Sequence, residues 1–282
     1  MGAGVDPYAG RRLVIASMHG KEAVIAPLLE AALGVQCIAG SGVDTDRLGT
    51  FTGEVARTLD PLAAAREKCR LAMDLYDCDL AVASEGSFGP HPSLAWLPAD
   101  DELVLLADRA SALEICGREV SAATNYSHAD IDSGAALLDF AQRMSFPSHG
   151  VILRSATPGR ERIIKDLTDE TALLAAWERL RAMGGSIRAE TDMRAMRNPT
   201  RMQVIAQATQ KLINKARSRC PECSAPGYSI TTIIHGLPCR WCGSPTRSAA
   251  GYQYRCAKCG YERTKPSERA YEDPMYCDVC NP

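Results

Sequence analysis

The chain has 282 residues, of which 46% are hydrophobic and 23% charged, and its formal net charge is −2 at pH 7. A near-neutral charge excludes the strongly basic proteins that attract nucleic acid or anionic membranes through their overall field. No stretch approaches the ~20 apolar residues that a membrane-spanning helix needs, and the first residues do not resemble a secretory signal. We therefore expect a cytoplasmic protein without a membrane partner, with one large domain and one small one.

The N-terminal part of the chain alternates strand and helix patterns. Residues 12–17 are an apolar run typical of a buried strand, and the helical pattern that follows ends at Gly34. Residues 35–39 are a second candidate strand. Asp60 and Pro61 suit the N-cap and the first position of a long helix.

Further strands and helices are expected to interleave up to about residue 217. A strand at 79–84 should end in a turn rich in glycine and proline, and 102–107 with 113–121 should form a hairpin. The pattern predicts an α/β domain over residues 1–217, with a mixed sheet flanked by helices, and a separate module over 218–282. The remaining predicted helices are at about 133–144, 169–183 and 199–217, and the remaining strands are near 150–154, 161–165 and 186–190.

The segment IASMHGK at 15–21 places a glycine-containing turn and Lys21 between a strand and a helix. Backbone N–H groups and the helix dipole favour an anion at such a turn, and Lys21 adds a full positive charge. The GxxxxGK[ST] pattern of a Walker A loop is absent. The alternative interpretation is a surface lysine in an ordinary turn.

An acidic loop lies before the helix at Pro61, with Asp44, Asp46, Glu54 and Asp60. Carboxylate oxygens suit Mg2+, which often binds phosphate at the same time. The alternative is solvated loop charge, in which Asp60 serves only as the helix cap.

The segment SEGSFGPHP at 84–92 is the most specific pattern in the N-terminal part. Glu85 is expected at the end of a buried strand, beside glycines that let a ligand approach the backbone. Ser84 and Ser87 add hydroxyl groups. A plain turn would not require a carboxylate at this point, so we interpret the segment as functional.

Three arginines follow one another at spacings of three and four residues: Arg194, Arg197 and Arg201. A guanidinium group can bind two oxygens of one phosphate or carboxylate at the same time. Glu190 and Asp192 lie just upstream, so an internally salt-bridged surface is an equally good interpretation.

Four CxxC pairs lie in the last 63 residues, separated by 15, 13 and 17 residues. Two such pairs complete a tetrahedral site of four thiolates around zinc, with no open position for catalysis. We therefore predict two structural zinc ions. Sequential pairing suits the spacing, and pairing of the first pair with the third and the second with the fourth remains open. The predicted ligands are Cys220, Cys223, Cys239, Cys242, Cys256, Cys259, Cys277 and Cys280.

The order of the N-terminal motifs resembles, distantly, the inosine-triphosphate-pyrophosphatase-like superfamily, which includes the Maf proteins and the inosine/xanthosine triphosphatases. Ala16–Lys21 is similar to the turn after the family's first strand. Glu54 or Asp60, followed by Arg66 and Lys68, is similar to its acidic residue and helix. Ala83–Gly86 looks like its acidic turn, and Thr200-Arg201 like its late Thr-Arg pair.

The resemblance implies an enzyme of that fold, in which Mg2+ assists the attack of water on the α-phosphate of a nucleoside triphosphate. It implies catalytic, metal-holding roles for Glu85 and for Glu54 or Asp60. The residues implied to bind phosphate are His19, Lys21, Lys68, Ser84 and Arg201.

The whole chain more closely resembles a bacterial family described only as a domain of unknown function. The segments that carry this resemblance are Thr50–Glu54, Ala83–Pro92, Thr191–Met202 and the ending Cys280–Pro282. This resemblance supplies no function.

We therefore expect a Mg2+-dependent nucleotide pyrophosphohydrolase, or an enzyme acting on another phosphate-bearing small molecule, with a two-zinc module. The alternative is a non-catalytic zinc-ribbon protein that binds nucleic acid or a protein. Basic and aromatic residues interleave in the module, as in surfaces that bind single-stranded nucleic acid. The sequence does not predict an oligomeric state.

Overall fold

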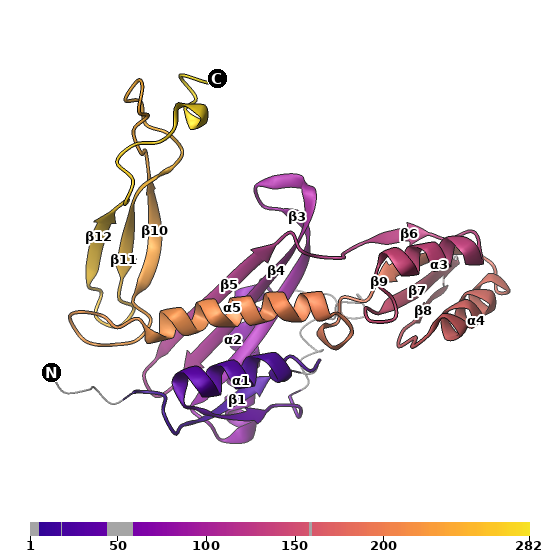
Figure 1. Ribbon diagram of the computed structural model, residues 1–282. Coiled ribbons are helices and arrows are strands. Elements are labelled where there is room, and N and C mark those ends of the chain that lie inside the picture. The colour runs from indigo at the N-terminus through magenta and orange to yellow at the C-terminus, as the bar shows by residue number, and fades with distance from the viewer. Residues whose placement is uncertain (1–5, 18, 44–58, 158–159) are drawn as a thin grey trace. The chain divides into compact units, whose positions relative to one another are not determined.

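A computed structural model describes residues 6–17, 19–43, 59–157 and 160–282 (Figure 1). Its contacts divide the chain into two compact units. The first comprises the chain up to Ala110 together with Cys116–Leu212, and the second comprises Ser111–Ile115 and Ile213–Pro282. Asp44, Asp46 and Glu54 of the predicted acidic loop lie outside the described residues.

A five-stranded mixed sheet forms the centre of the first unit, which confirms the predicted α/β class. Its strands follow the order β2-β1-β3-β4-β5. β1 is parallel to both β2 and β3, whereas β3 and β4 form a long antiparallel hairpin. The strands are β1 (Arg12–Ala16), β2 (Gln36–Ala39), β3 (Leu80–His91), β4 (Leu94–Asp108) and β5 (Leu113–Ser121).

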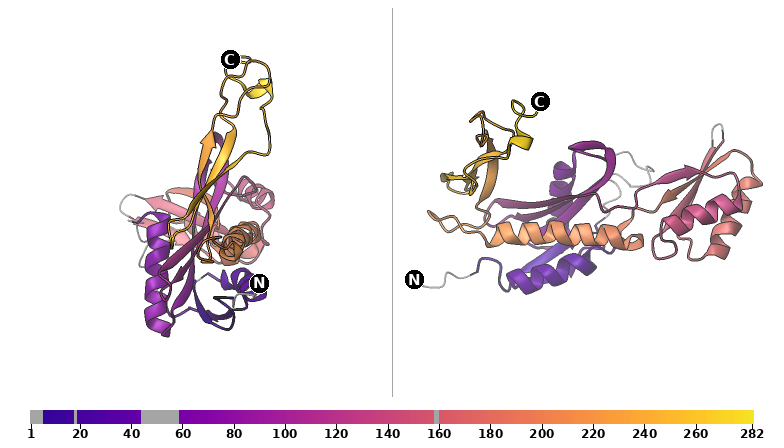
Figure 2. Two further views of the ribbon diagram at one scale, coloured as in Figure 1. Left: turned by 90° about the vertical axis from the view of Figure 1, so that its left-hand side faces the viewer. Right: turned by 45° about the horizontal axis from the view of Figure 1, so that its top comes forward.

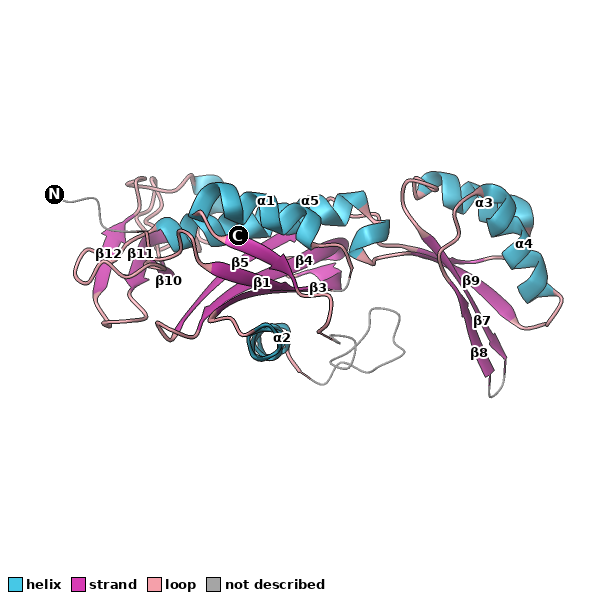
Figure 3. Ribbon diagram, turned by 90° about the horizontal axis from the view of Figure 1, so that it is seen from below, coloured by secondary structure: helices cyan, strands magenta, loops and turns pink. Residues whose placement is uncertain are grey.

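Helices cover both faces of this sheet. α1 (Glu22–Leu33) and α5 (Pro199–Arg217) lie on one face, and α2 (Pro61–Tyr76) lies on the other (Figure 3). The connection that leaves β1 contains α1, on one face of the sheet, and the connection that leads into β3 contains α2, on the other face. The carboxyl end of β1 therefore lies where the two connections diverge. That is the usual position of a ligand site in α/β sheets.

Local signals account for the ends of these helices. Gly34 adopts φ 64° and donates its N–H to the carbonyl of Glu30, which closes α1. Asp60 accepts hydrogen bonds from the N–H groups of Leu62 and Ala63, and Pro61 occupies the first position of α2, as predicted.

β3 is longer than the sequence suggested. We expected a strand ending at Ser84 and a loop from Glu85, but the strand continues to His91 and pairs with β4 throughout. The prediction of a turn at 85–92 is therefore wrong, and Glu85 lies within a strand. The long partner strand β4 supplies the hydrogen bonds that keep this glycine-rich segment extended.

A second, four-stranded sheet belongs to the same unit and has the order β6-β9-β7-β8. α3 (Gly134–Arg143) and α4 (Glu170–Arg181) pack on it, with Leu137, Phe140 and Trp177 in the shared core. The strands are β6 (His128–Asp130), β7 (Val151–Thr157), β8 (Arg160–Ile164) and β9 (Ser186–Thr191). A short 3-10 helix, η2 (Ala195–Arg197), precedes α5.

The second unit, which includes the yellow end of the chain in Figure 2, is built on a three-stranded antiparallel sheet. In this sheet β11 (Ala249–Arg255) lies between β10 (Ser229–His235) and β12 (Glu262–Pro266), as labelled in Figure 1. A 3-10 helix, η3 (Pro274–Tyr276), precedes the last CxxC pair. Among the residues that the structure describes, no helix combines the length and the apolarity that crossing a bilayer would need.

Candidate active site and metal centres

Lys21 reaches β3 at the point where β1 stops. The last pair between β1 and β3 joins Ala16 to Ala83, so the next carbonyl on β3, that of Ser84, faces the end of β1. The Lys21 ammonium donates to this carbonyl at 3.2 Å and to the Ser84 hydroxyl oxygen at 3.0 Å. Both side chains are buried, so the structure brings two of the predicted phosphate-binding residues together beneath the surface.

Glu85 points to the opposite face of β3 from Ser84, because successive strand residues alternate. There it forms an ion pair with Lys68 of α2, and the two side chains are 8% and 12% exposed. The helix that Asp60 caps therefore positions Lys68 beside the carboxylate that we predicted as catalytic. Both residues belong to the predicted site.

Two carboxylates that the sequence analysis missed lie on the neighbouring strand. Glu102 is paired with Gly86 and Asp100 with Phe88 in the β3–β4 register, so both point to the face of β3 that carries Ser84. Both are completely buried. The available signal was the run Asp100-Asp101-Glu102, since alternation in a strand places the first and third carboxylates on one face.

Arg201 of α5 is the partner of Glu102. Its Nε donates to Glu102 Oε1 at 2.6 Å, its Nη1 donates to the carbonyl of Met193, and its guanidinium lies 5.2 Å from the centre of the Phe88 ring. We predicted Arg201 as a phosphate ligand. The structure places it inside the protein, where it is 1% exposed and bound to protein groups.

Gly86 makes this arrangement possible. A Cβ atom at this position would collide with Glu102 Oε1 and would lie 2.6 Å from Nη2 of Arg201. The glycine therefore admits the Glu102–Arg201 pair against the backbone of β3. We expected the glycines of this segment to admit a ligand, and at Gly86 the group admitted is a side-chain pair.

These side chains form one group of interacting charges, which we call the charge cluster: Lys21, Lys68, Glu85, Asp100, Glu102 and Arg201. Burial, followed by the charge of Arg201, lowers the pKa of Lys21 to about 7. Burial, followed by the nearby Glu102 carboxylate, raises the pKa of Asp100 to about 8. Because Asp100 then holds a proton at neutral pH, its carboxyl group does not offset the positive charges of the cluster.

The other predicted site residues have simpler surroundings. The Asp60 carboxylate caps α2, which is the alternative that the sequence left open for it. His19 lies half-buried in the turn between β1 and α1. Glu54 falls outside the described residues.

The arginine-rich segment before α5 is paired internally. Arg194 binds Asp192 and Asp166, and Arg197 also binds Asp166. Asn198 caps α5 by accepting a hydrogen bond from the N–H of Arg201. Of the two interpretations of this segment, the structure therefore shows the salt-bridged one.

The eight module cysteines form two groups of four, and the pairing is crossed. The first and third CxxC pairs meet, as do the second and fourth. The groups are Cys220, Cys223, Cys256 and Cys259, and Cys239, Cys242, Cys277 and Cys280.

The sulfur geometry fits zinc. Distances between sulfurs of different pairs are 3.7 Å in the first group and 3.6 and 3.9 Å in the second. A tetrahedron with Zn–S bonds of about 2.3 Å has sulfurs about 3.8 Å apart, so the observed spacing suits a four-thiolate zinc site. In each pair the first cysteine is 1% exposed, which places the sites partly inside the unit.

Tight turns orient the thiolates. The residue after each second cysteine donates its N–H to the carbonyl of the first cysteine, as Ser224, Gly243, Gly260 and Asn281 do. The first three of these adopt positive φ angles of 59°, 72° and 74°. This backbone conformation folds both sulfurs of a pair to one side.

The family of the chain follows from comparison with known proteins. A family model described as a domain of unknown function, DUF6671, matches residues 68–282. The chain belongs to this family. No curated protein matches the sequence.

The DUF6671 match begins at Lys68 and includes both cysteine groups and most of the charge cluster. Lys21 precedes the matched residues, so the cluster joins a residue outside the family model to residues inside it. The family description itself assigns no activity to these residues.

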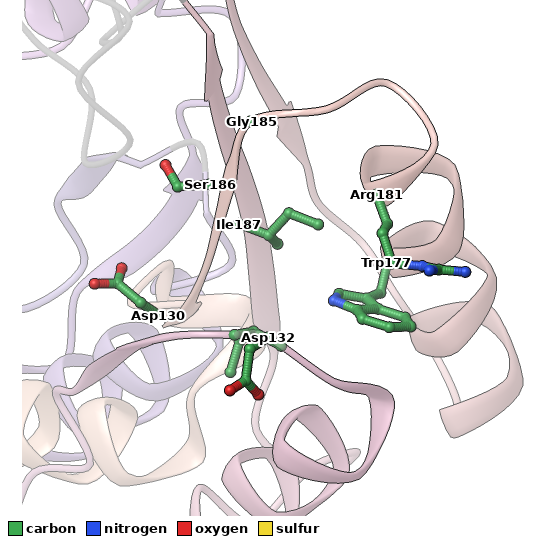
Figure 4. A pocket seen from close by; sticks show the side chains of 8 residues that line it. Asp130, Asp132, Trp177, Arg181, Gly185, Ser186 and Ile187 are labelled. Carbon is green, nitrogen blue, oxygen red and sulfur yellow. The ribbon is translucent and has the colours of Figure 1, made fainter.

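A separate cavity of about 390 Å³ lies on the second sheet, between β9 and α4 (Figure 4). Trp177 and Arg181 project towards it from α4, opposite Asp130, Asp132 and Ile187. None of the predicted site residues lines this cavity. Most of its lining residues are exposed and none belongs to the charge cluster, so the charge cluster is the better candidate for chemistry.

Proposed function

We propose that the first unit is a Mg2+-dependent hydrolase that cleaves a nucleoside triphosphate between the α- and β-phosphates. The observation that carries the proposal is the pairing of Lys21 with Ser84 and of Lys68 with Glu85 at the carboxyl end of β1. Two lysines therefore bind adjacent residues of one strand there, Lys21 on one face of the sheet and Lys68, with the Glu85 carboxylate, on the other. A carboxylate suits a divalent cation, and lysines suit the phosphate oxygens that the cation would also contact.

The charge balance supports an anionic substrate. When Asp100 is protonated, the charge cluster contains three basic side chains, Lys21, Lys68 and Arg201, and two further carboxyl groups, those of Glu85 and Glu102. Buried excess positive charge is costly unless an anion compensates it. A phosphate group bound at the end of β1 would supply that compensation.

In this proposal Glu85 would hold the cation, directly or through water, and Mg2+ bound there would polarise the phosphate and lower the pKa of the attacking water. Lys68 holds the Glu85 carboxylate in an ion pair before substrate arrives. Lys21 and Lys68 then offset negative charge as the bond from water to the α-phosphorus forms and the bond to the bridging oxygen breaks. The products are a nucleoside monophosphate and pyrophosphate.

Pyrophosphate release from a panel of nucleoside triphosphates, including the inosine and xanthosine forms, tests the proposal with Mg2+ and with Mn2+. We expect turnover by the wild type and at least a 100-fold lower kcat for Glu85→Gln. Asp101→Asn is the matched control, because Asp101 lies on β4 near the site but pairs with Arg118 at the surface. Its kcat should stay within about twofold of the wild type.

Zinc content should remain at two per chain in all of these proteins, so that loss of activity is separable from loss of the module. Complete inactivity of the wild type across the panel with both metals would overturn the enzyme proposal and favour the non-catalytic alternative. Equal activity of Glu85→Gln and the wild type would instead remove Glu85 from the mechanism.

A further inference from the structure

Large apolar side chains are exposed around the second cysteine group. Two of them lie between the cysteines of a CxxC pair, and two directly precede Cys277. The fifth is next to Glu272, which forms a β-bridge with Cys239. They therefore gather around a single site. The residues of this surface, which we call the knuckle patch, are Trp241 (78% exposed), Tyr271 (54%), Met275 (60%), Tyr276 (61%) and Val279 (66%).

The first cysteine group provides an internal comparison. Its two turns carry Pro221-Glu222 and Ala257-Lys258 between the cysteines, whereas those of the second group carry Arg240-Trp241 and Asp278-Val279. Both groups have sulfur spacings that suit zinc. Zinc binding therefore does not require large apolar residues in these turns.

Other residues serve the packing beneath the second group. Leu237 is 3% exposed, and Pro274, Thr246 and Glu272 are also buried. The hydroxyl of Thr246 donates to the carbonyl of Leu237, and Glu272 accepts from Arg269. Because the local structure has its own core and hydrogen bonds, the side chains of the knuckle patch are not needed for folding. Exposed apolar surface of this kind marks interaction sites.

The charge around the patch indicates the class of partner. Residues 236–248 and 267–282 contain three arginines and four carboxylates, Arg240, Arg247 and Arg269 against Glu268, Glu272, Asp273 and Asp278. A zinc ion with four thiolates adds a formal charge of −2. The surroundings are thus net negative and would repel a phosphate backbone. Met275 and Val279 also lack the ring face on which a base would stack.

We propose that the knuckle patch docks an apolar segment of a partner protein that carries lysine or arginine beside its apolar residues. Trp241 and Tyr276 are the expected anchors, since tryptophan and tyrosine dominate binding energy at protein interfaces. Basic flanks on the partner would complement the negative surroundings and raise the rate of association. This proposal does not depend on the activity of the first unit.

Selection from a phage library of random 12-residue peptides on the immobilised full-length protein tests the proposal. Enriched peptides should combine aromatic or aliphatic residues with lysine or arginine. As synthetic peptides in fluorescence anisotropy, they should bind Trp241→Ser at least tenfold more weakly than the wild type. Trp96→Ser is the matched control, because Trp96 is also 78% exposed but lies on β4, and binding should be unchanged.

Each variant should retain two zinc ions per chain, which excludes unfolding of the module as the cause of lost binding. Four results would overturn the proposal. Peptides that bind Trp241→Ser as well as the wild type would remove the patch from binding, and acidic peptides would contradict the charge argument. If Trp241→Ser abolishes binding of a 20-nucleotide single strand, the patch would be assigned to nucleic acid. If it abolishes a concentration-dependent dimer, the patch would be assigned to a second copy of the chain.

Discussion

Glu102 and Arg201, which are 99 positions apart in the chain, form an ion pair with an Oε1–Nε distance of 2.6 Å. Both side chains are 0% exposed. The pair connects β4 to the first turn of α5 directly over the backbone of β3. It therefore ties the strand that carries Ser84 and Glu85 to the helix that covers one face of the sheet.

Substitution of Gly86 should destabilise the first unit because the Glu102–Arg201 pair occupies the space of its side chain. We expect Gly86→Ala to lower the free energy of unfolding by about 1–3 kcal/mol, the usual cost of overpacking. Gly89→Ala, on the same strand, is the control, since a Cβ there would meet nothing within 4 Å. Urea unfolding followed by circular dichroism measures both, and equal stability of the two variants would contradict the structure.

Removing one partner of the buried pair should cost more than removing both. Arg201→Met leaves a buried carboxylate without its guanidinium and should lower the free energy of unfolding by about 3–5 kcal/mol. The double variant Glu102→Met with Arg201→Met removes both charges of the pair together and should recover part of that loss. Chemical unfolding provides the measurement, with Lys211→Met, which breaks an exposed pair with Glu119, as a control of small effect.

The buried carboxyl of Asp100 should make stability depend on pH. Burial raises its pKa from 3.8 to about 8, so between these values the folded protein keeps a proton that the unfolded chain releases. The contribution of Asp100 to stability is therefore greatest at low pH and is lost as pH rises through this window. Asp100→Asn should remove this loss of stability with rising pH. The free energy of unfolding of the variant, minus that of the wild type, should therefore increase from pH 5 to pH 8.

Lys21 acts in the opposite direction at higher pH. Burial lowers its pKa from 10.5 to about 7, so between these values the unfolded chain holds the additional proton and stability rises with pH. Asp100→Asn should leave this rise intact. Unfolding curves at unit pH intervals separate the two effects. If the free energy of unfolding still falls with pH in Asp100→Asn but not in Asp101→Asn, the assignment of this fall to Asp100 would be refuted.

The crossed pairing of the cysteines predicts different zinc contents for two double variants. Cys220→Ser with Cys256→Ser removes ligands from one group only, so one zinc per chain should remain. Cys220→Ser with Cys239→Ser damages both groups and should abolish tight binding of both ions. Metal analysis after gel filtration distinguishes these outcomes, and sequential pairing would reverse them.

Several features of the fold could be predicted from the sequence because their causes are local. Asp60-Pro61 and Asn198-Pro199 mark helix starts, and Gly34 marks a helix end, since caps depend on residues within one turn. The CxxC pairs likewise specify metal-binding turns from four neighbouring residues. The predicted helices and most strands agree with the structure for this reason.

The arrangement of the candidate site depends on contacts that are distant in sequence. Lys21, Lys68 and Glu85 were recognised individually, but only the sheet order places them on one stretch of β3. Asp100 and Glu102 were missed because their roles arise from the register of β4 against β3. Glu85 was assigned to a loop because the strand-like state of residues 85–91 comes from pairing with β4 rather than from local preference.

The four CxxC pairs show most clearly which features the sequence determines locally and which depend on tertiary contacts. Their sequence determined that the C-terminal module presents thiolates in pairs that suit zinc, because both sulfurs of a pair are oriented within a single turn. Which pairs share an ion was decided by the three-stranded sheet. It brings the residues before β10 beside those after β11, and the β10–β11 connection beside the last pair of the chain.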